Sequence, residues 1–302
     1  MFCFFPFLSF SRGDNDFQCQ ITVMMVLEAA RLTTFQKGCN ILQASQWYDF
    51  TTNESGAAIY FNPTDKDSNI WIKCCYFERC FVPEGNDGAM FISCNTIDLN
   101  CVAASDIAAK QNQFGTIEAV KRKKFTCKFI STYKSGMLSS CPVGESNNIL
   151  CKLGLFLWET ANITHSEVSG DGCCLTPQDL SNTVIKFTHF LNSKADICIP
   201  LRRSISSKKI IEKVNFVNLT STTAVIMMES QWVCNTINIQ NCRGPIFKMA
   251  VVKTFVTIND FYFDFSFSDY PGISVNKKFQ TDSYLIPISD NFLYNRYRWN
   301  LN

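Results

Sequence analysis

The sequence predicts an all-β, single-domain chain folded as a right-handed parallel β-helix of about nine coils. Three observations support this prediction: many short strand-like runs, a loose internal repeat of coil length, and an apolar but charge-poor composition. Of the 302 residues, 46% are hydrophobic and 18% are charged, and the net charge is +2. This is enough apolar material to bury a core, so intrinsic disorder is excluded. A β-sandwich is the structural alternative, because it also consists of many short strands.

The strand-like runs are rich in β-branched and aromatic residues and are separated by Gly, Asn, Asp and Ser. In the repeat, a small residue opens a short apolar strand, a polar turn follows, and a second strand alternates and often ends near Cys or Asn. The small openers recur about every 24 residues and are Gly56, Gly88, Gly115, Gly136, Gly154, Gly172, Ala195, Ala224 and Gly244. In a parallel solenoid each strand pairs with its equivalent one coil away, so Ile, Val, Phe and Cys are expected to form inward ladders.

Four segments are predicted along the chain. Residues 1–13 form a possible signal peptide or a disordered end. Their apolar run favours a signal peptide, whereas the lack of a preceding basic residue and of a cleavage site favours a disordered end. Residues 14–38 form an N-terminal cap, in which 21–32 is a short amphipathic helix or a first strand. Residues 39–265 form the β-helix, and 266–302 form a C-terminal cap or tail. No transmembrane segment is expected, because no apolar run approaches about 20 residues.

The repeat resembles a known pattern. The segment 56–61 reads Gly-Ala-Ala-Ile-Tyr-Phe and 75–80 reads Cys-Tyr-Phe-x-x-Cys, with related copies at 88–92 and 127–130. This is similar to the degenerate right-handed parallel β-helix repeats of protist surface proteins, above all those of trichomonads, which have been likened to bacterial polymorphic outer-membrane proteins. The resemblance covers residues 39–263, although Gly-Gly is reduced to Gly-Ala and later coils lose the glycine. It implies a pectin-lyase-like fold without implying lyase activity.

The cysteines argue against a metal centre. The chain has 16 Cys and two His, and no two Cys are three positions apart, so neither half of a zinc site is present. No metal and no cofactor are therefore expected. By coil position, Cys80 with Cys101 and Cys127 with Cys151 are candidates for disulfides, because equivalent positions of adjacent coils are within disulfide range. The alternative, left open here, is a ladder of buried free thiols.

No catalytic set is visible. His165 and His189 lie in successive predicted strands without a nucleophile and an orienting group, and Asp260 and Asp264 lack a third acid. Two short basic runs, at 121–124 and 202–209, fall short of a nucleic-acid footprint, so no nucleic acid is expected as a partner. The sequons at Asn53, Asn162 and Asn218 permit glycosylation without establishing it.

We therefore expect a non-catalytic interaction or adhesion-type protein of the cell surface or extracellular space, whose partner is an unknown host or cell-surface protein or a glycan. A rigid solenoid with variable loops suits this role. The alternatives are a carbohydrate-active β-helix enzyme, of the polysaccharide lyase or hydrolase kind, and a divergent product without independent activity. A cytoplasmic location is the alternative to a surface one, since the state of the cysteines follows the compartment.

Overall fold

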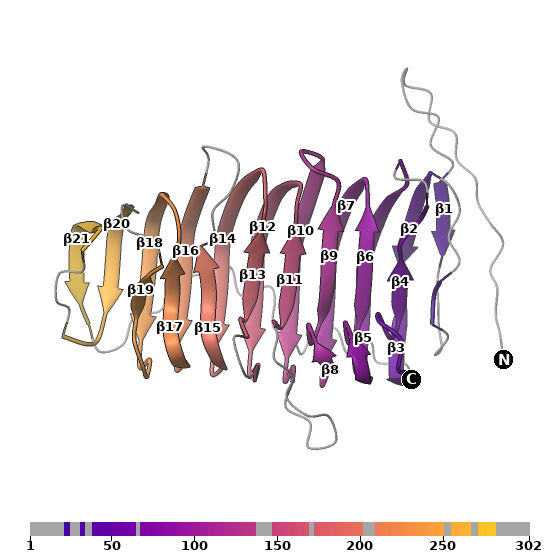
Figure 1. Cartoon of the computed structure of the whole chain (residues 1–302), viewed down its shortest axis with the longest axis horizontal. Coiled ribbons are helices and arrows are strands. Elements are labelled where there is room, and N and C mark those ends of the chain that lie inside the picture. Colours follow the sequence, from indigo (N-terminus) through magenta and orange to yellow (C-terminus); the bar gives the residue numbers. More distant parts are fainter. Residues whose placement is uncertain are drawn as a thin grey trace.

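The strands stack along one axis as the coils of a parallel β-solenoid, as the computed structural model shows (Figure 1). The structure describes residues 21–24, 31–33, 38–64, 67–136, 147–168, 172–201, 209–250, 255–266 and 271–281. Every strand pairing in these ranges is parallel, with a partner one coil away, and the register shifts only within the pairs β15–β17 and β5–β8. A sandwich of hairpins would pair antiparallel strands, so the alternative fold is ruled out.

Sheet A runs the length of the molecule. Along its main path it contains β1 (Ile21–Met24), β2 (Cys39–Gln43), β5 (Asn69–Asn86), β7 (Thr96–Ser105), β10 (Lys124–Tyr133), β12 (Leu155–Thr164), β14 (Asn182–Leu191), β16 (Lys209–Val217), β18 (Trp232–Gln240), β20 (Val256–Phe263) and β21 (Ile273–Gln280). Two further strands, β3 (Gln46–Thr51) and β8 (Ala108–Gln111), pair with the long strand β5.

Two shorter sheets close the coils on the other side. Sheet B contains β4 (Ile59–Phe61), β6 (Met90–Cys94), β9 (Gly115–Ala119), β11 (Ile149–Lys152) and β13 (Leu175–Gln178). Sheet C contains β15 (Lys194–Leu201), β17 (Thr220–Met228) and β19 (Phe247–Met249). The outcome is a solenoid of about seven turns.

The predicted count of about nine coils was therefore too high. Gly136 and Gly154 were taken as coil openers, but neither begins a strand of sheet B or C. Gly154 has a φ of 77° and lies directly before β12 of sheet A, while the sheet B strand of that coil is β11. Small residues mark several kinds of turn in this fold, so counting them overestimates the number of coils.

Of the two alternatives for residues 21–32, the cap helix was wrong and the first strand is found at 21–24. Residues 21–24 form the parallel strand β1, which pairs with β2, and no helix occurs in the described ranges. The physical reason is that β2 offers an open sheet edge, whose backbone groups a further strand can pair. Sheet A likewise continues beyond residue 265 into β21. The possible signal segment 1–13 lies outside the described residues.

Two sharp corners recur on the sheet A side from the coil of β2 to the coil of β16. A non-glycine residue with positive φ occurs at Ala44, Cys74, Cys101, Phe129, Thr160, Phe187 and Lys213, and again five positions later at Asp49, Arg79, Asp106, Lys134, His165, Asn192 and Asn218. One left-handed residue bends the strand sharply without ending the ladder on either side. Asn and Asp adopt this conformation most easily, which suits their frequency at the second corner.

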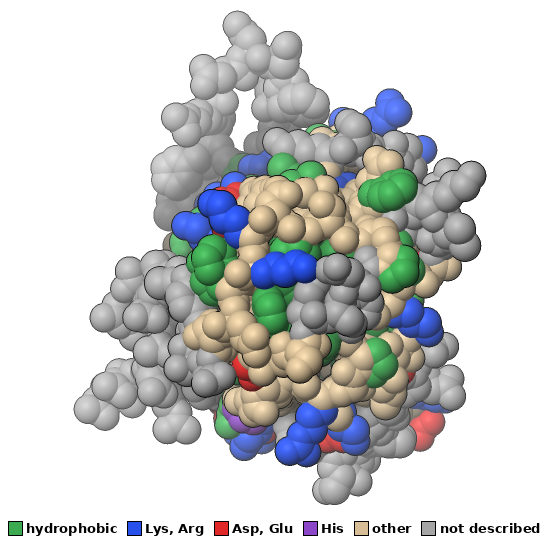
Figure 2. Space-filling view, turned by 90° about the vertical axis from the view of Figure 1, so that its left-hand side faces the viewer, with side chains coloured by type: hydrophobic (Ala, Val, Ile, Leu, Met, Phe, Trp, Pro, Cys, Tyr) green, Lys and Arg blue, Asp and Glu red, His purple; other side chains and the backbone are tan. Residues whose placement is uncertain are grey.

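The core is a set of ladders formed by inward side chains. Phe190 and Phe216 are register partners whose rings stack with centroids 5.1 Å apart, and Trp47 and Phe77 stack in the same way at 4.8 Å. Seen from the β21 end of the solenoid, hydrophobic side chains are visible within the ring of backbone (Figure 2). The high phenylalanine content is thus explained largely by stacking between coils.

Candidate functional site

The outer surface of sheet A is formed by the strand segments before the first corners. In β12 the inward Phe156 and Trp158 are buried, whereas Leu155 is 40% exposed, and Leu157 and Glu159 are partly exposed. Successive side chains of a strand point to opposite faces, so Leu155, Leu157 and Glu159 share the outer face. Because the strands pair in register, equivalent outward residues form rows along the solenoid axis.

One outward row is aliphatic over four consecutive strands. Leu157, Val184, Ile210 and Val233 are successive register partners from β12 to β18, and they are called the aliphatic stripe below. The first three are partly exposed, and Val233 is 43% exposed. Contiguous exposed apolar residues on a flat surface are typical of an interaction site.

The same row is polar on both sides of the stripe. Asp98 and Thr126 occupy it in β7 and β10, and Thr257 and Ser274 occupy it in β20 and β21. Further toward the N-terminus the row contains Trp71, whose ring is approached by the ammonium of Lys73 at 5.7 Å from its centroid. The stripe is therefore a bounded feature of the outer face.

A row of alternating charge runs beside the stripe, two residues later in each strand. Lys128, Glu159, Lys186 and Glu212 are register partners in β10, β12, β14 and β16, and they are called the charge row below. Lys128 Nζ lies 2.8 Å from Glu159 Oε2, and Lys186 Nζ lies 3.0 Å from Glu212 Oε2. The row continues as an amide ladder formed by Asn235, Asn259 and Asn276, with Nδ2–Oδ1 distances of 2.9 and 2.7 Å.

A shallow depression of about 390 Å³ adjoins the C-terminal end of the stripe. Its lining residues are Lys209, Gln231, Trp232, Val233, Phe255 and Thr257. Phe255 is 61% exposed, the largest exposure among the large hydrophobic side chains in the described ranges. The depression extends the apolar surface of the stripe by one aromatic ring.

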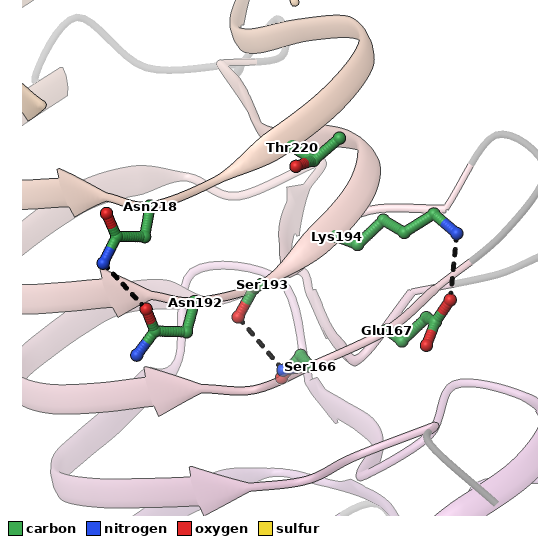
Figure 3. A pocket seen from close by; sticks show the side chains of 7 residues that line it. All are labelled: Ser166, Glu167, Asn192, Ser193, Lys194, Asn218 and Thr220. Carbon is green, nitrogen blue, oxygen red and sulfur yellow. Dashed lines mark hydrogen bonds and ion pairs between the residues drawn. The ribbon is translucent and has the colours of Figure 1, made fainter. Parts of the chain in front are cut away.

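A second, polar groove of about 300 Å³ lies at the second corners (Figure 3). Its amide ladder begins with Asn218 Nδ2, which donates to Asn192 Oδ1 at 2.9 Å, and Asn241 donates to Asn218 in turn. Lys194 Nζ lies 3.0 Å from Glu167 Oε1 across the groove. These side chains already use their hydrogen-bonding and charged groups on one another. The groove is therefore better explained as a stabilised corner than as a ligand site.

The chain matches no family model, no curated protein and no solved structure. Its chemistry is therefore interpreted from its own residues. In the part of the chain that the structure describes, no three His, Cys, Asp or Glu side chains gather as metal ligands, and no helix has the length and apolarity to cross a membrane.

The four cysteines singled out from the sequence are free thiols in the structure. Cys80, Cys127 and Cys151 are buried in the core, and Cys101 is partly exposed. Burial raises the pKa of the Cys80 thiol to about 12 and raises the pKa of Cys127 and Cys151 well above the ordinary value. Such thiols act as small apolar residues.

The register does not bring the proposed cysteine pairs together as equivalent positions. Cys80 of β5 is in register with Phe50, and Cys127 of β10 is in register with Leu99 and Trp158. Cys151 belongs to sheet B, so Cys127 and Cys151 lie in different sheets. The equivalent of Cys101 is Cys74, because Lys73 pairs with Asn100 and Cys75 pairs with Val102. Among the other cysteines, Cys39 is disulfide-bonded.

The three sequon asparagines differ in accessibility. Asn53 is exposed in a bend, Asn162 is partly exposed within β12, and Asn218 is exposed at a second corner. Both polar atoms of the Asn218 amide already hydrogen-bond within the asparagine ladder. A glycan would occupy the Nδ2 atom that donates to Asn192, so Asn53 is the sequon that a sugar would disturb least.

The residues considered for catalysis are separated by the fold. His165 lies at a second corner with its ring 5.1 Å from that of Tyr133, and His189 Nδ1 lies 3.2 Å from Asn215 Nδ2. Asp260 lies 3.8 Å from Lys277, and Asp264 accepts a hydrogen bond from a backbone amide at 2.6 Å. Of the basic runs, 121–124 is an exposed stretch leading into β10, and 202–208 lies outside the described residues.

The structure contains a buried carboxylate that the sequence alone did not indicate. Asp87 is 2% exposed and accepts hydrogen bonds from Thr116 Oγ1 at 2.5 Å and Asn112 Nδ2 at 3.2 Å. Burial raises the pKa of Asp87 to about 6, and the two hydrogen bonds oppose that rise. Asp87 forms no ion pair with a described residue, and its place in a polar ladder indicates a structural role.

The aliphatic stripe was also missed, although the sequence carries a signal for it. Alternation was expected in each outward-facing strand, but Leu155-Phe-Leu-Trp158 is apolar at every position. An unbroken apolar run in a strand with one solvent-facing side places hydrophobic residues on both faces. Several such runs in consecutive coils predict an apolar outer row.

Proposed function

We propose that the chain is a non-catalytic interaction protein of the adhesion type, and that its binding surface is the outer face of sheet A. The aliphatic stripe is the observation that supports this most. Four outward aliphatic side chains in register on a rigid sheet form an apolar surface that the core does not use. A protein surface is the partner that suits this face, because another protein can present both apolar side chains to the stripe and charges to the charged residues beside it.

The charge row indicates which protein surface fits. Read along the axis, it is Lys128, Glu159, Lys186, Glu212, and read in reverse it presents the opposite sign at each position. A two-fold axis parallel to the strands, between β12 and β14, would therefore place Glu159 opposite Lys186 of a second copy. The same axis would place Lys128 opposite Glu212. A surface that is complementary to itself is what a two-fold interface requires.

The stripe overlaps the charge row but is centred one strand later, between β14 and β16, so about the same axis Ile210 would face Thr126 and Val233 would face Asp98. The axis between β12 and β14 would place Leu157 opposite Val184 of the second copy. Two sheets packed face to face lie about 10 Å apart, which lets aliphatic side chains interdigitate while the charges pair at the rim. We therefore take the occupant of this face to be a second copy of the chain, with the two solenoid axes antiparallel.

Surface location and family remain part of the proposal. The resemblance to trichomonad-type surface repeats supports an extracellular place, where binding between identical faces on two cells would produce adhesion. A pectin-lyase-like ancestry is proposed on the same resemblance alone. The parallel solenoid agrees with the fold of such repeats.

The proposal is tested by sedimentation and by aggregation of protein-coated beads. The intact chain is expected to dimerise with rising concentration and to aggregate coated beads. Val184→Lys buries two ammonium groups in the interface and is expected to weaken dimerisation at least about tenfold. Ser274→Lys, in the same row but beyond both the stripe and the depression, is the matched control and is expected to dimerise like the unaltered chain.

Three results would overturn the proposal. The first is an intact chain that remains monomeric at the highest soluble concentration, and the second is beads that stay dispersed. The third is equal weakening by Val184→Lys and Ser274→Lys. Depolymerisation of an acidic polysaccharide by the purified chain would instead support the carbohydrate-active alternative.

A further inference from the structure

Two cysteines occupy equivalent corners of adjacent coils. Cys74 has a φ of 52° and Cys101 a φ of 58°, and both are the first-corner residues of their coils, in β5 and β7. Residues on both sides of the corner are register partners, since Lys73 pairs with Asn100 and Cys75 pairs with Val102. Parallel strands lie about 4.8 Å apart, so the two Cα atoms fall within the range that a disulfide spans.

The side chains of this pair face one another at the surface. The two thiols lie within hydrogen-bonding reach, and both cysteines are partly exposed. Within the described residues, Cys242 is the one other free cysteine that is partly exposed, and the remaining nine free cysteines are buried. Burial is the main cause that raises the pKa of Cys74, followed by the charge of Cys101, and the ammonium of Lys73 opposes the rise.

We propose that Cys74 and Cys101 form an oxidisable dithiol site that closes into a disulfide between two coils. The oxidant is a small-molecule disulfide such as oxidised glutathione. One thiolate attacks a sulfur of glutathione disulfide and releases one glutathione, which leaves a mixed disulfide on the protein. The second thiolate attacks the protein sulfur of that mixed disulfide and releases the second glutathione. Two protein S–H bonds are lost, one S–S bond forms, and two glutathione thiols are produced.

A buried pair provides an internal comparison. Cys174 and Cys198 are equivalent positions of adjacent coils, since Cys173 bridges to Ile197, and their thiols are also within hydrogen-bonding reach. They are only 1% and 2% exposed. A bulky disulfide has no access to them while the chain is folded, so they are expected to stay reduced under conditions that oxidise Cys74 and Cys101.

The site would clamp the outer corner of two early coils. The closed loop spans the residues from Cys74 to Cys101 and contains the later part of β5, β6 of sheet B and the first half of β7. The bond would hold two coils in register at a corner that requires left-handed backbone from both residues. Oxidation is therefore expected to raise resistance to denaturant without changing the fold.

The test is oxidation of the folded, full-length chain by glutathione disulfide at mildly alkaline pH, followed by thiol blocking and peptide mapping. Trypsin and chymotrypsin together separate Cys101 from Cys80 and Cys94, because cleavage follows Arg79, Phe91 and Leu99. The expected product is a peptide containing Cys74 and Cys75 linked to the peptide containing Cys101, with the loss of two hydrogens and no bound glutathione. A reductant such as dithiothreitol should restore the original masses.

Two substitutions assign the bond within the Cys74–Cys75 peptide. Cys74→Ser should abolish the link and leave a glutathione adduct on Cys101, because no second thiol can displace it. Cys75→Ala removes the buried neighbour, which is 2% exposed, and should leave the link intact. Circular dichroism under the same conditions confirms that each variant is folded.

The proposal is overturned if the folded chain keeps both thiols reduced, or if both carry glutathione without linking. It is also overturned if Cys74→Ser leaves the link unchanged, which would assign the bond to Cys75. Preferential oxidation of Cys174 and Cys198 would contradict the argument from access. Should Cys75→Ala fail to fold, the Cys74→Ser adduct on Cys101 still decides the assignment.

Discussion

Two stretches of the same outward row differ in chemistry although their backbones are equivalent. In β7 and β10 the row carries Asp98 and Thr126, whereas from β12 onward it carries Leu157, Val184 and its successors. The inward neighbours are alike in the two stretches, since Leu99 and Trp158 are both fully buried. The fold thus fixes what points inward and leaves the outward row free. We attribute the aliphatic residues of the second stretch to the proposed binding.

The largest change in the free energy of unfolding is expected when a buried side chain inside the solenoid is truncated. This should hold in both stretches of the row. Trp158→Ala, directly beside the stripe, removes a fully buried ring and is expected to lower the free energy of unfolding by about 3–5 kcal/mol. Urea denaturation measures this change. Trp158→Phe is the control and should cost much less, because the buried indole Nε1 has no hydrogen-bond partner in the described structure.

A pH effect is expected in the early coils, where the buried acid lies. The pKa of Asp87 is raised from an ordinary 3.8 to about 6 by burial, so the folded state holds its proton more tightly than the unfolded state. Stability from this group is complete below about pH 4 and is lost as the pH rises through about 6. The loss is on the order of 2–3 kcal/mol.

Asp87→Asn isolates this contribution. The variant keeps an oxygen that can accept from Thr116 and Asn112 but has no charge to bury. The difference in unfolding free energy between the variant and the unaltered chain should grow in favour of the variant between pH 4 and pH 7. A constant difference over that range would show that Asp87 is ionised in the folded state with an ordinary pKa.

Making the stripe resemble the polar stretch should barely change stability. Val184→Thr with Ile210→Thr reproduces the chemistry of Thr126 in two later strands. Threonine retains β-branching on a partly exposed strand face, so the free energy of unfolding is expected to change by less than about 1 kcal/mol. Dimerisation should nevertheless be lost. A large loss of stability would mean that the stripe belongs to the packing of the monomer.

The smallest effect is expected at the second corner. Asn218→Ala removes two amide hydrogen bonds at an exposed residue whose φ is 55°, and a loss of about 1 kcal/mol is expected. Asn218→Gly also removes the amide hydrogen bonds but adopts left-handed backbone easily, so it should lower the stability less than Asn218→Ala. The difference between the two variants gives the backbone contribution, apart from that of the amide ladder. Thermal unfolding of the two variants measures the difference.

The sequence predicted the solenoid and its ladders because apolar alternation and repeat length both reflect pairing between coils. It did not predict the corners, since Phe129, Thr160 and Phe187 are unfavourable in left-handed backbone and are held there by the ladders on either side. The Cys74 and Cys101 pair was missed for a related reason. Aligning the repeat on its last cysteine matched Cys101 with Cys80, whereas the corner defines the true register.

The central claim, that the outer face of sheet A binds a second copy of itself, is tested most directly by exchanging charges in the charge row. Glu159→Lys alone and Lys186→Glu alone each create two like-charge contacts across the proposed two-fold axis, so each variant is expected to sediment as a monomer. An equimolar mixture of the two restores both opposite-charge contacts and is expected to form a mixed dimer. A mixture that remains monomeric, or single variants that dimerise as well as the unaltered chain, would contradict the claim.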